Sequence, residues 1–225
     1  MSEKSCSAET PLSDTAEILT AAPPSEHGPK VGGQLILVAT PIGNLADISE
    51  RAIETLQSVE AILCEDTRVT AKLLMSRNIS TPTRTLHDHN EQDRTPFLIE
   101  KLSAGARYAV VSDAGTPLVS DPGYCLVRAA VVAGIPVTAS PGPNAVITAL
   151  TLSGRPPLLF MVPGSPDPRS EAPKTGLAKL LAAEQAGVRP SLIWHEATHT
   201  LVDTLEDLIY VFGQNHDAGV GTGAA

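Results

Sequence analysis

Short segments of strand length alternate with amphipathic stretches from residue 34 onward. Five such segments, each ending in a polar or Gly- and Pro-containing turn, lie at 35–39, 60–64, 84–90, 108–111 and 135–139. The stretches between them have helical spacing, as where Ala52, Ile53 and Leu56 fall on one face. Strands that alternate with helices predict a parallel sheet with helices on both faces, and we place this α/β domain at 34–152.

The chain beyond this domain is divided by a stiff connection. Residues 153–157 read Ser-Gly-Arg-Pro-Pro, a non-helical linker, and a second α/β domain is expected at 158–212. Its strands (158–162 and 191–194) and helices (176–186 and 201–212) are too few to bury both faces of a sheet, so we expect a truncated domain. Residues 1–33 and 213–225 read as a disordered leader and a disordered tail.

Composition excludes several classes of protein. With 16 Lys and Arg against 25 Asp and Glu, the formal net charge of −9 argues against broad nucleic-acid binding through phosphate neutralisation. No apolar run approaches the roughly 20 residues that span a bilayer, and no targeting segment precedes the domain, so we expect a cytoplasmic protein without membrane contact. Cys6, Cys64 and Cys125 lack metal-ligand spacing, so we expect no metal site and free thiols.

Four polar turns follow strands of the first domain, at 40–45, 65–68, 113–123 and 141–144. Because the carboxyl ends of parallel strands share one edge of the sheet, these turns predict a ligand cleft there. Gly115 and Gly123 allow positive φ or close approach of a ligand, while Pro117 and Pro122 stiffen the loop. Neither a G-x-x-x-x-G-K-[ST] loop nor a G-x-G-x-x-G turn is found, so the common nucleotide folds are poorly supported.

The turns also carry a specific resemblance. In order along the chain stand A-T-P-I-G-N-L-A-D-I (39–48), E-D-T-R (65–68), H-D-H-N-E (87–91), S-D-A-G-T-P-L (112–118), D-P-G (121–123) and P-G-P (141–143). Over residues 34–155 the chain resembles the bacterial small-subunit ribosomal RNA (cytidine-2′-O)-methyltransferases of the tetrapyrrole methylase superfamily. Several motifs in register are far more specific than any one of them.

The resemblance implies two α/β domains with a cleft between them for S-adenosylmethionine. It also implies a homodimer that methylates the 2′-hydroxyl of a cytidine in the decoding region of 16S rRNA, within the small ribosomal subunit. By similarity, the cofactor contacts fall on Ile42, Ala114, Gly115, Thr116, Val119, Asn144 and Ala145.

Methyl transfer to a ribose hydroxyl needs a group that removes the hydroxyl proton. The candidates by position are Glu65, His87, His89 and Asp113, and the sequence does not choose between them. Asp66 and Asp88 stand before helical stretches, where a helix cap is the simpler interpretation. A structural role stays open for His87 and His89, although two imidazoles at one strand exit point toward function, since imidazole titrates near neutral pH.

The resemblance weakens after residue 155. The family usually has an aromatic-Gly-Phe-Leu-Pro segment followed by clustered basic residues, whereas this chain reads Phe-Met-Val-Pro-Gly-Ser-Pro at 160–166. Glu196 and His199 keep a Glu-x-x-His pattern, but the arginine that follows it in the family is missing. Two alternatives therefore stay open: a non-catalytic or weakly active remnant that binds the cofactor, and a methylase of a small tetrapyrrole.

Overall fold

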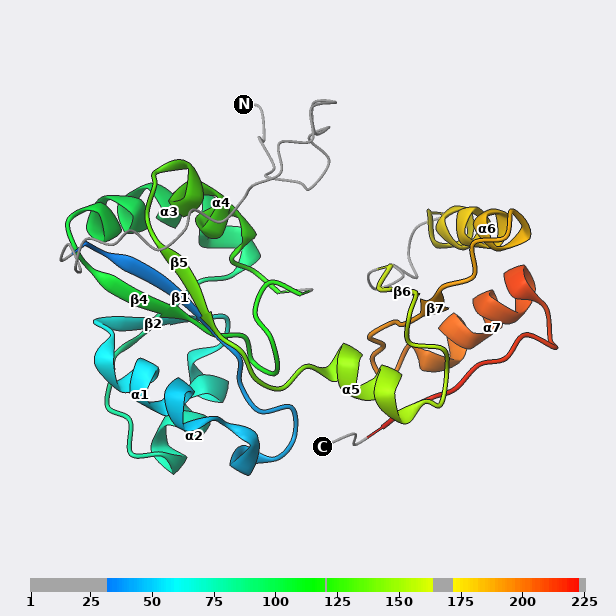
Figure 1. Cartoon of the computed structure of the whole chain (residues 1–225), viewed down its shortest axis with the longest axis horizontal. Coiled ribbons are helices and arrows are strands. Elements are labelled where there is room, and N and C mark those ends of the chain that lie inside the picture. Colours follow the sequence, from blue (N-terminus) through cyan, green and yellow to red (C-terminus); the bar gives the residue numbers. More distant parts are fainter. Residues whose placement is uncertain (1–31, 120, 164–171, 223–225) are drawn as a thin grey trace. The chain divides into compact units, whose positions relative to one another are not determined.

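The computed structural model describes residues 32–119, 121–163 and 172–222, so the expected leader lies almost wholly outside the described residues. Contacts divide the described chain into two compact units. The first unit comprises residues 32–40 and 48–142, and the second comprises 41–47 and 143–222. Figure 1 shows the elements of each unit, which are described separately here. The linker at 153–157 remains an expectation from the sequence, and the contacts group residues 143–152 with the second unit.

The first unit is built on a five-stranded parallel sheet, which confirms the predicted α/β class. Its strands are β1 (Gln34–Val38), β2 (Ala61–Cys64), β3 (Thr83–Thr85), β4 (Arg107–Val110) and β5 (Val137–Ser140), in the order β3-β2-β4-β1-β5. Its helices are α1 (Glu50–Ser58), α2 (Thr67–Ser76), α3 (Asp88–Ser103) and α4 (Tyr124–Val132). The chain therefore places β1 between β4 and β5.

Helices cover both faces of this sheet, α1 and α2 on one and α3 and α4 on the other (Figure 1). Neighbouring residues of one strand enter different cores: Ile36 packs in the cluster with Leu56 of α1, and Leu35 in the cluster with Leu126 of α4. β1 and β2 are largely buried on both sides, and their sequences, Gln-Leu-Ile-Leu-Val and Ala-Ile-Leu-Cys, are nearly continuous apolar runs. The edge strands β3 and β5 are less buried and contain polar residues.

Helix α1 is capped differently from what its sequence suggests. Asp47 and Glu50 have the spacing of a capping box, but Asp47 ends a short 3-10 helix, Leu45–Asp47. The N-cap is Ser49, whose hydroxyl accepts a hydrogen bond from the backbone N–H of Ala52 at 3.1 Å. Spacing alone does not separate two good cap residues that lie two positions apart.

The second unit contains α5 (Ala145–Leu152), β6 (Phe160–Met161), α6 (Ala172–Gln185), β7 (Ser191–Leu192) and α7 (Leu201–Phe212). β6 and β7 pair in parallel, and α6 packs against α7. Both strands are shorter than predicted. Residues 213–222 form neither helix nor strand, and Asp217 among them pairs with Arg155 at 3.1 Å.

The cysteines differ from expectation in one respect. Cys64 is a buried free thiol on β2, and burial raises its pKa. Cys125 is disulfide-bonded, so the prediction of free thiols was wrong for this residue. An odd number of cysteines excludes complete pairing but not a single pair.

Within the described residues, no helix is long and apolar enough to cross a membrane.

Candidate functional site

The loops after β1 and β4 are joined at the carboxyl edge of the sheet. Thr40 and Gly115 form an antiparallel bridge in which each backbone N–H donates to the other carbonyl, at 2.8 and 3.1 Å. The hydroxyl of Thr40 also donates to the backbone carbonyl of Ser112 at 3.2 Å. The hydroxyl of Ser112 in turn donates to the backbone carbonyl of Gly115 at 3.1 Å. All three residues are buried, so these bonds fix the start of the loop 112–123.

Gly115 and Gly123 both need the freedom that the sequence suggested. Their φ angles are 85° and 120°, and Leu118 between them also has a positive φ of 72°. A Cβ added at Gly123 would lie 2.6 Å from Cδ2 of Leu118. The backbone at positions 115 and 123 therefore requires glycine.

The loop after β2 carries two acidic residues, one that caps helix α2 and one whose carboxylate is exposed. Asp66 is the N-cap of α2, because its carboxylate accepts from the backbone N–H of Arg68 at 2.8 Å and pairs with the guanidinium at 2.7 Å. This pairing lowers the pKa of Asp66 to about 2. Asp113 accepts from the backbone N–H of Asp66 at 3.3 Å. The exposed carboxylate of Glu65 accepts no hydrogen bond from the described residues.

His87 is held in one orientation by Asn90. The backbone N–H of His87 donates to Oδ1 of Asn90 at 3.0 Å, which turns the amide nitrogen of Asn90 toward Nε2 of His87 at 3.1 Å. An amide nitrogen only donates, so Nε2 accepts and the neutral ring carries its proton on Nδ1. The buried Nδ1 has no partner among the described residues. The lone pair of neutral His87 is thus already engaged.

Negative charge accumulates around this edge. Burial raises the pKa of Glu65, and the charges of Asp113 and Asp88 raise it further, while nearby His87 lowers it. Asp121 shows the larger effect: burial, and then the charges of Glu65, Asp113 and Asp88, raise its pKa to about 6. Desolvated carboxylates near one another favour the neutral form, so this edge attracts protons and cationic groups.

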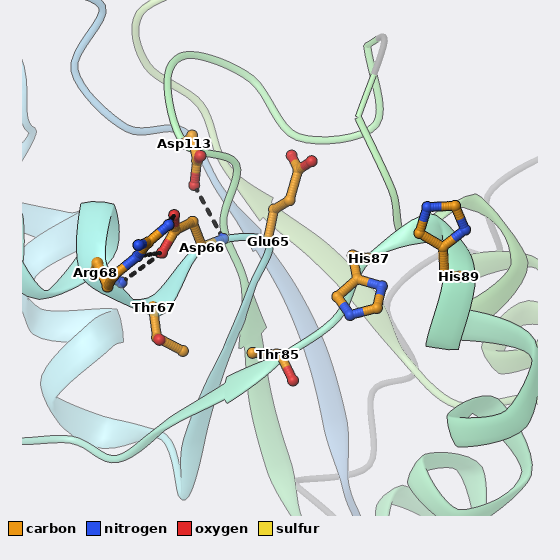
Figure 2. A pocket seen from close by; sticks show the side chains of 8 residues that line it. All are labelled: Glu65, Asp66, Thr67, Arg68, Thr85, His87, His89 and Asp113. Carbon is orange, nitrogen blue, oxygen red and sulfur yellow. Dashed lines mark hydrogen bonds and ion pairs between the residues drawn. The ribbon is translucent and has the colours of Figure 1, made fainter.

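One open pocket of about 480 Å³ brings the four catalytic candidates together (Figure 2). It is lined by Glu65, Asp66, Thr67, Arg68, Thr85, His87, His89 and Asp113. Figure 2 shows that these side chains come from the ends of β2, β3 and β4 and from the first turns of α2 and α3. The ring of His89 stands edge-on to that of His87, with centroids 5.9 Å apart. Among the described residues, no group of His, Cys, Asp and Glu is placed to hold a metal ion.

The seven cofactor candidates fall in different units. Ala114, Gly115, Thr116 and Val119 lie in the loop after β4, in the first unit. Ile42, Asn144 and Ala145 lie in the second unit. Asn144 is the N-cap of α5 and accepts from the backbone N–H of Ile147 at 3.0 Å.

Sequence reasoning missed several residues of this edge. Thr40 and Ser112 join two loops through buried hydroxyls, and Asp121 carries the most perturbed carboxyl group at the edge. Polar residues directly after apolar runs were the available signal for Thr40 and Ser112. The perturbation of Asp121 depends on neighbours from β2, β4 and α3, so no local pattern predicts it.

The pocket lies at the carboxyl edge of a parallel sheet that helices cover on both faces. Comparison with known proteins identifies the class of protein. Residues 34–224 match the family model described as Tetrapyrrole (Corrin/Porphyrin) Methylases. The chain belongs to this family, as its motifs indicated.

Particular relatives are named more narrowly. The chain is 48% identical over 183 residues to "Ribosomal RNA small subunit methyltransferase I" of Escherichia coli O157:H7, covering 81% of this chain and 62% of the relative. It is 48% identical over 179 residues to the protein of the same name from Vibrio cholerae serotype O1, covering 80% and 60%. The chain thus spans about three fifths of the length of these relatives.

Solved structures agree on the fold. A crystal structure of diphthine synthase superposes with a TM-score of 0.60 at 16% identity, covering 80% of this chain and 72% of that one. A conserved hypothetical protein from Aeropyrum pernix K1 gives a TM-score of 0.59 at 15% identity, covering 75% and 59%. At such identities the likeness concerns the fold alone.

Proposed function

We propose that this chain binds S-adenosylmethionine and transfers its methyl group to the ribose 2′-hydroxyl of a cytidine in the decoding region of 16S rRNA. We further propose that it acts on the small ribosomal subunit, in the cytoplasm, as a homodimer. The observation that carries the proposal is the open pocket that Glu65, His87, His89 and Asp113 line together. Family membership supports methyl transfer, and the names of the relatives favour ribosomal RNA over a tetrapyrrole.

The charge of the edge suits this cofactor. S-adenosylmethionine carries a sulfonium, an ammonium and a carboxylate group, so it is a net cation without phosphate. The carboxylates of Glu65, Asp113 and Asp121 place negative charge at the same edge as the loop 112–123. A phosphate-bearing cofactor would be repelled there. In the proposed site, Ala114, Gly115, Thr116 and Val119 of the loop after β4 contact the cofactor. Ile42, Asn144 and Ala145 stay candidates that the family resemblance implies.

When bound, the cofactor supplies an electrophilic methyl group on sulfur. An O–CH₃ bond to the ribose forms as the S–CH₃ bond breaks, and the hydroxyl proton must pass to a nearby base. We assign this role to Glu65 in preference to Asp113 and His87. Its carboxylate accepts no hydrogen bond from the described residues, whereas Asp113 accepts one from Asp66 and the lone pair of neutral His87 is engaged by Asn90. The raised pKa of Glu65 makes it a stronger base than an ordinary carboxylate.

The test is methyl incorporation from radiolabelled cofactor into small ribosomal subunits that lack the modification. We expect Glu65→Gln to lower kcat about 100-fold, the lower end for loss of a general base, and to weaken cofactor binding far less, because the charges of Asp113 and Asp121 remain. Glu60→Gln is the matched control, because Glu60 is an exposed carboxylate at the opposite end of β2. Equal activity of the two variants would remove Glu65 from the mechanism.

The cofactor half of the proposal has its own test. We expect Gly115→Val to abolish cofactor binding in calorimetric titration, because a branched residue is strained at φ 85° and crowds a buried turn. Gly154→Val is the control, since a Cβ there meets nothing within 4 Å. Binding without methyl incorporation would favour the non-catalytic alternative.

Recognition of the RNA has a separate test. Equal incorporation into folded subunits and into unstructured RNA of the same sequence would argue against recognition of a folded site.

A further inference from the structure

Among the described residues, Glu91 is the only buried residue with a charged side chain, and only 5% of its surface is exposed. It is the last residue of the H-D-H-N-E motif and lies in the first turn of α3. A buried carboxylate is costly unless hydrogen bonds satisfy it. The burial of Glu91 is therefore explained by the hydrogen-bond donor that its carboxylate contacts.

That group is the amino end of the neighbouring helix α4. The backbone N–H of Leu126, in the first turn of α4, donates to Oε1 of Glu91 at 2.9 Å. The first N–H groups of a helix lack partners within the helix, and a carboxylate there also interacts favourably with the helix dipole. Glu91 thus supplies from α3 the cap that α4 does not supply itself.

The residue before α4 explains why the cap comes from another helix. The N-cap position is Gly123, which has no side chain to accept a hydrogen bond. A capping Ser or Asp cannot replace it easily, because φ is 120° and a Cβ would lie 2.6 Å from Leu118. The shape of the loop demands glycine, and the carboxylate of Glu91 compensates for the missing cap.

Glu91 therefore connects two parts of the edge. Four residues earlier on the same helix end, His87 lines the pocket and is oriented by Asn90. On its other side, Glu91 fixes the point where the loop 112–123 enters α4. The start of this loop is already fixed by Thr40, so Glu91 provides the second anchor.

We propose that Glu91 is a positioning residue that holds the loop 112–123 in its ligand-binding shape and thereby sets the affinity for the cofactor. The inference rests on the proposed function, since it takes this loop as part of the cofactor site. Glu91 touches neither the pocket nor the reacting groups. Its effect passes through the backbone of α4 and the loop.

The first experiment measures cofactor affinity by calorimetry at a temperature where circular dichroism shows each variant to be folded. We expect Glu91→Ala to weaken binding about tenfold or more, which corresponds to the loss of a charge-assisted hydrogen bond. Glu91→Gln keeps an acceptor of the same length and should stay within about threefold of the unmodified chain, because the neutral hydrogen bond remains. Glu100→Ala, an exposed carboxylate on the same helix, is the matched control and should bind normally.

Two results would overturn the proposal: affinity of Glu91→Ala equal to that of the unmodified chain, or no rescue by Glu91→Gln. If the alanine variant does not fold, Glu91→Asp replaces it, since this carboxylate is one methylene too short to reach Leu126. We expect the aspartate variant to lose affinity as well.

Amide hydrogen exchange of the cofactor-free protein separates this proposal from the proposed function. In Glu91→Ala the peptides that cover 112–126 should exchange faster, while those of β1 and β2 keep their protection. Unchanged exchange at 112–126 would refute the positioning role. Faster exchange in a chain that binds no cofactor would refute the proposed function alone.

Discussion

The two units differ in how they bury their apolar residues. In the first unit, helices enclose both faces of the sheet, and Leu35, Ile62 and Leu126 are fully buried. In the described part of the second unit, the buried hydrophobic residues are Val146, Leu150 and Leu177 alone. Leu158 is 99% exposed there, and Leu152, Val202 and Tyr210 are also more than half exposed. The pocket therefore lies on a unit that buries its own core, whereas the described part of the second unit exposes much of its apolar surface.

The largest expected effect tests this difference directly. Leu35→Ala should lower the free energy of unfolding of the first unit by about 3 kcal/mol, because it opens a cavity between β1 and α4. Leu158→Ala should change stability by less than about 0.5 kcal/mol, since its side chain contributes no burial. Urea unfolding measures both. Trp194, the single tryptophan of the chain, reports on the second unit by fluorescence, while circular dichroism reports on both. If Leu35→Ala shifts the fluorescence transition as far as the dichroism transition, the two units do not unfold independently.

A pair of glycines gives a smaller effect of the same kind. Gly123→Ala should destabilise the first unit by about 2–3 kcal/mol, because the backbone conformation is strained and the new Cβ meets Leu118. Gly154→Ala in the second unit has φ 68° but open space around it, so we expect about 1 kcal/mol from the backbone alone. Equal losses for the two variants, measured by the same urea unfolding, would show that the close approach to Leu118 relaxes at no cost.

The smallest effect is a pH dependence of opposite sign in the two units. Asp121, with its pKa raised to about 6, keeps a proton in the folded state that the unfolded chain releases near pH 4. The folded state thus binds more protons between these values, and the first unit loses stability as pH rises from about 4 to 6, by at most about 2 kcal/mol after solvent screening. Glu196 is the reverse case. Hydrogen bonds from Thr200 and Thr204 lower its pKa, so its contribution is lost as pH falls below the usual range of a glutamate.

Two variants separate these contributions. Asp121→Asn should flatten the dichroism-detected pH profile between 4 and 6. Glu196→Gln should flatten the acid side of the Trp194 fluorescence profile and leave the first unit unchanged. A first unit that gains stability steadily from pH 4 to 6 would contradict the sign given for Asp121.

Much of the first unit could be predicted from the sequence because its signals are local. Continuous apolar runs indicated strands covered on both faces, and the parallel sheet confirmed them. The placement of Glu65, His87 and Asp113 at strand ends follows from the same rule, although their roles stay predictions. The strand order β3-β2-β4-β1-β5 was not predicted, since it depends on which strands meet after long crossovers.

The site residues that escaped prediction act over long stretches of chain. Thr40 bonds to Gly115, and Glu91 caps a helix that begins at Tyr124. A motif shows that a glutamate stands at position 91, but not that a glycine more than thirty residues later needs its carboxylate. The second unit was predicted less closely for a related reason: its strands are only two residues long, and length is the signal on which strand prediction depends.

The central position of β1 in the sheet has a consequence for synthesis on the ribosome. β1 is made before the other described strands of its sheet, yet its partners are β4, where Gln34 faces Arg107, and β5, where Val38 faces Ser140. β2 and β3 can pair earlier, because Ile62 faces Thr83. The nascent chain must therefore carry the apolar segment 35–38 unpaired until residue 110 has emerged, which leaves this segment open to aggregation while the polypeptide grows.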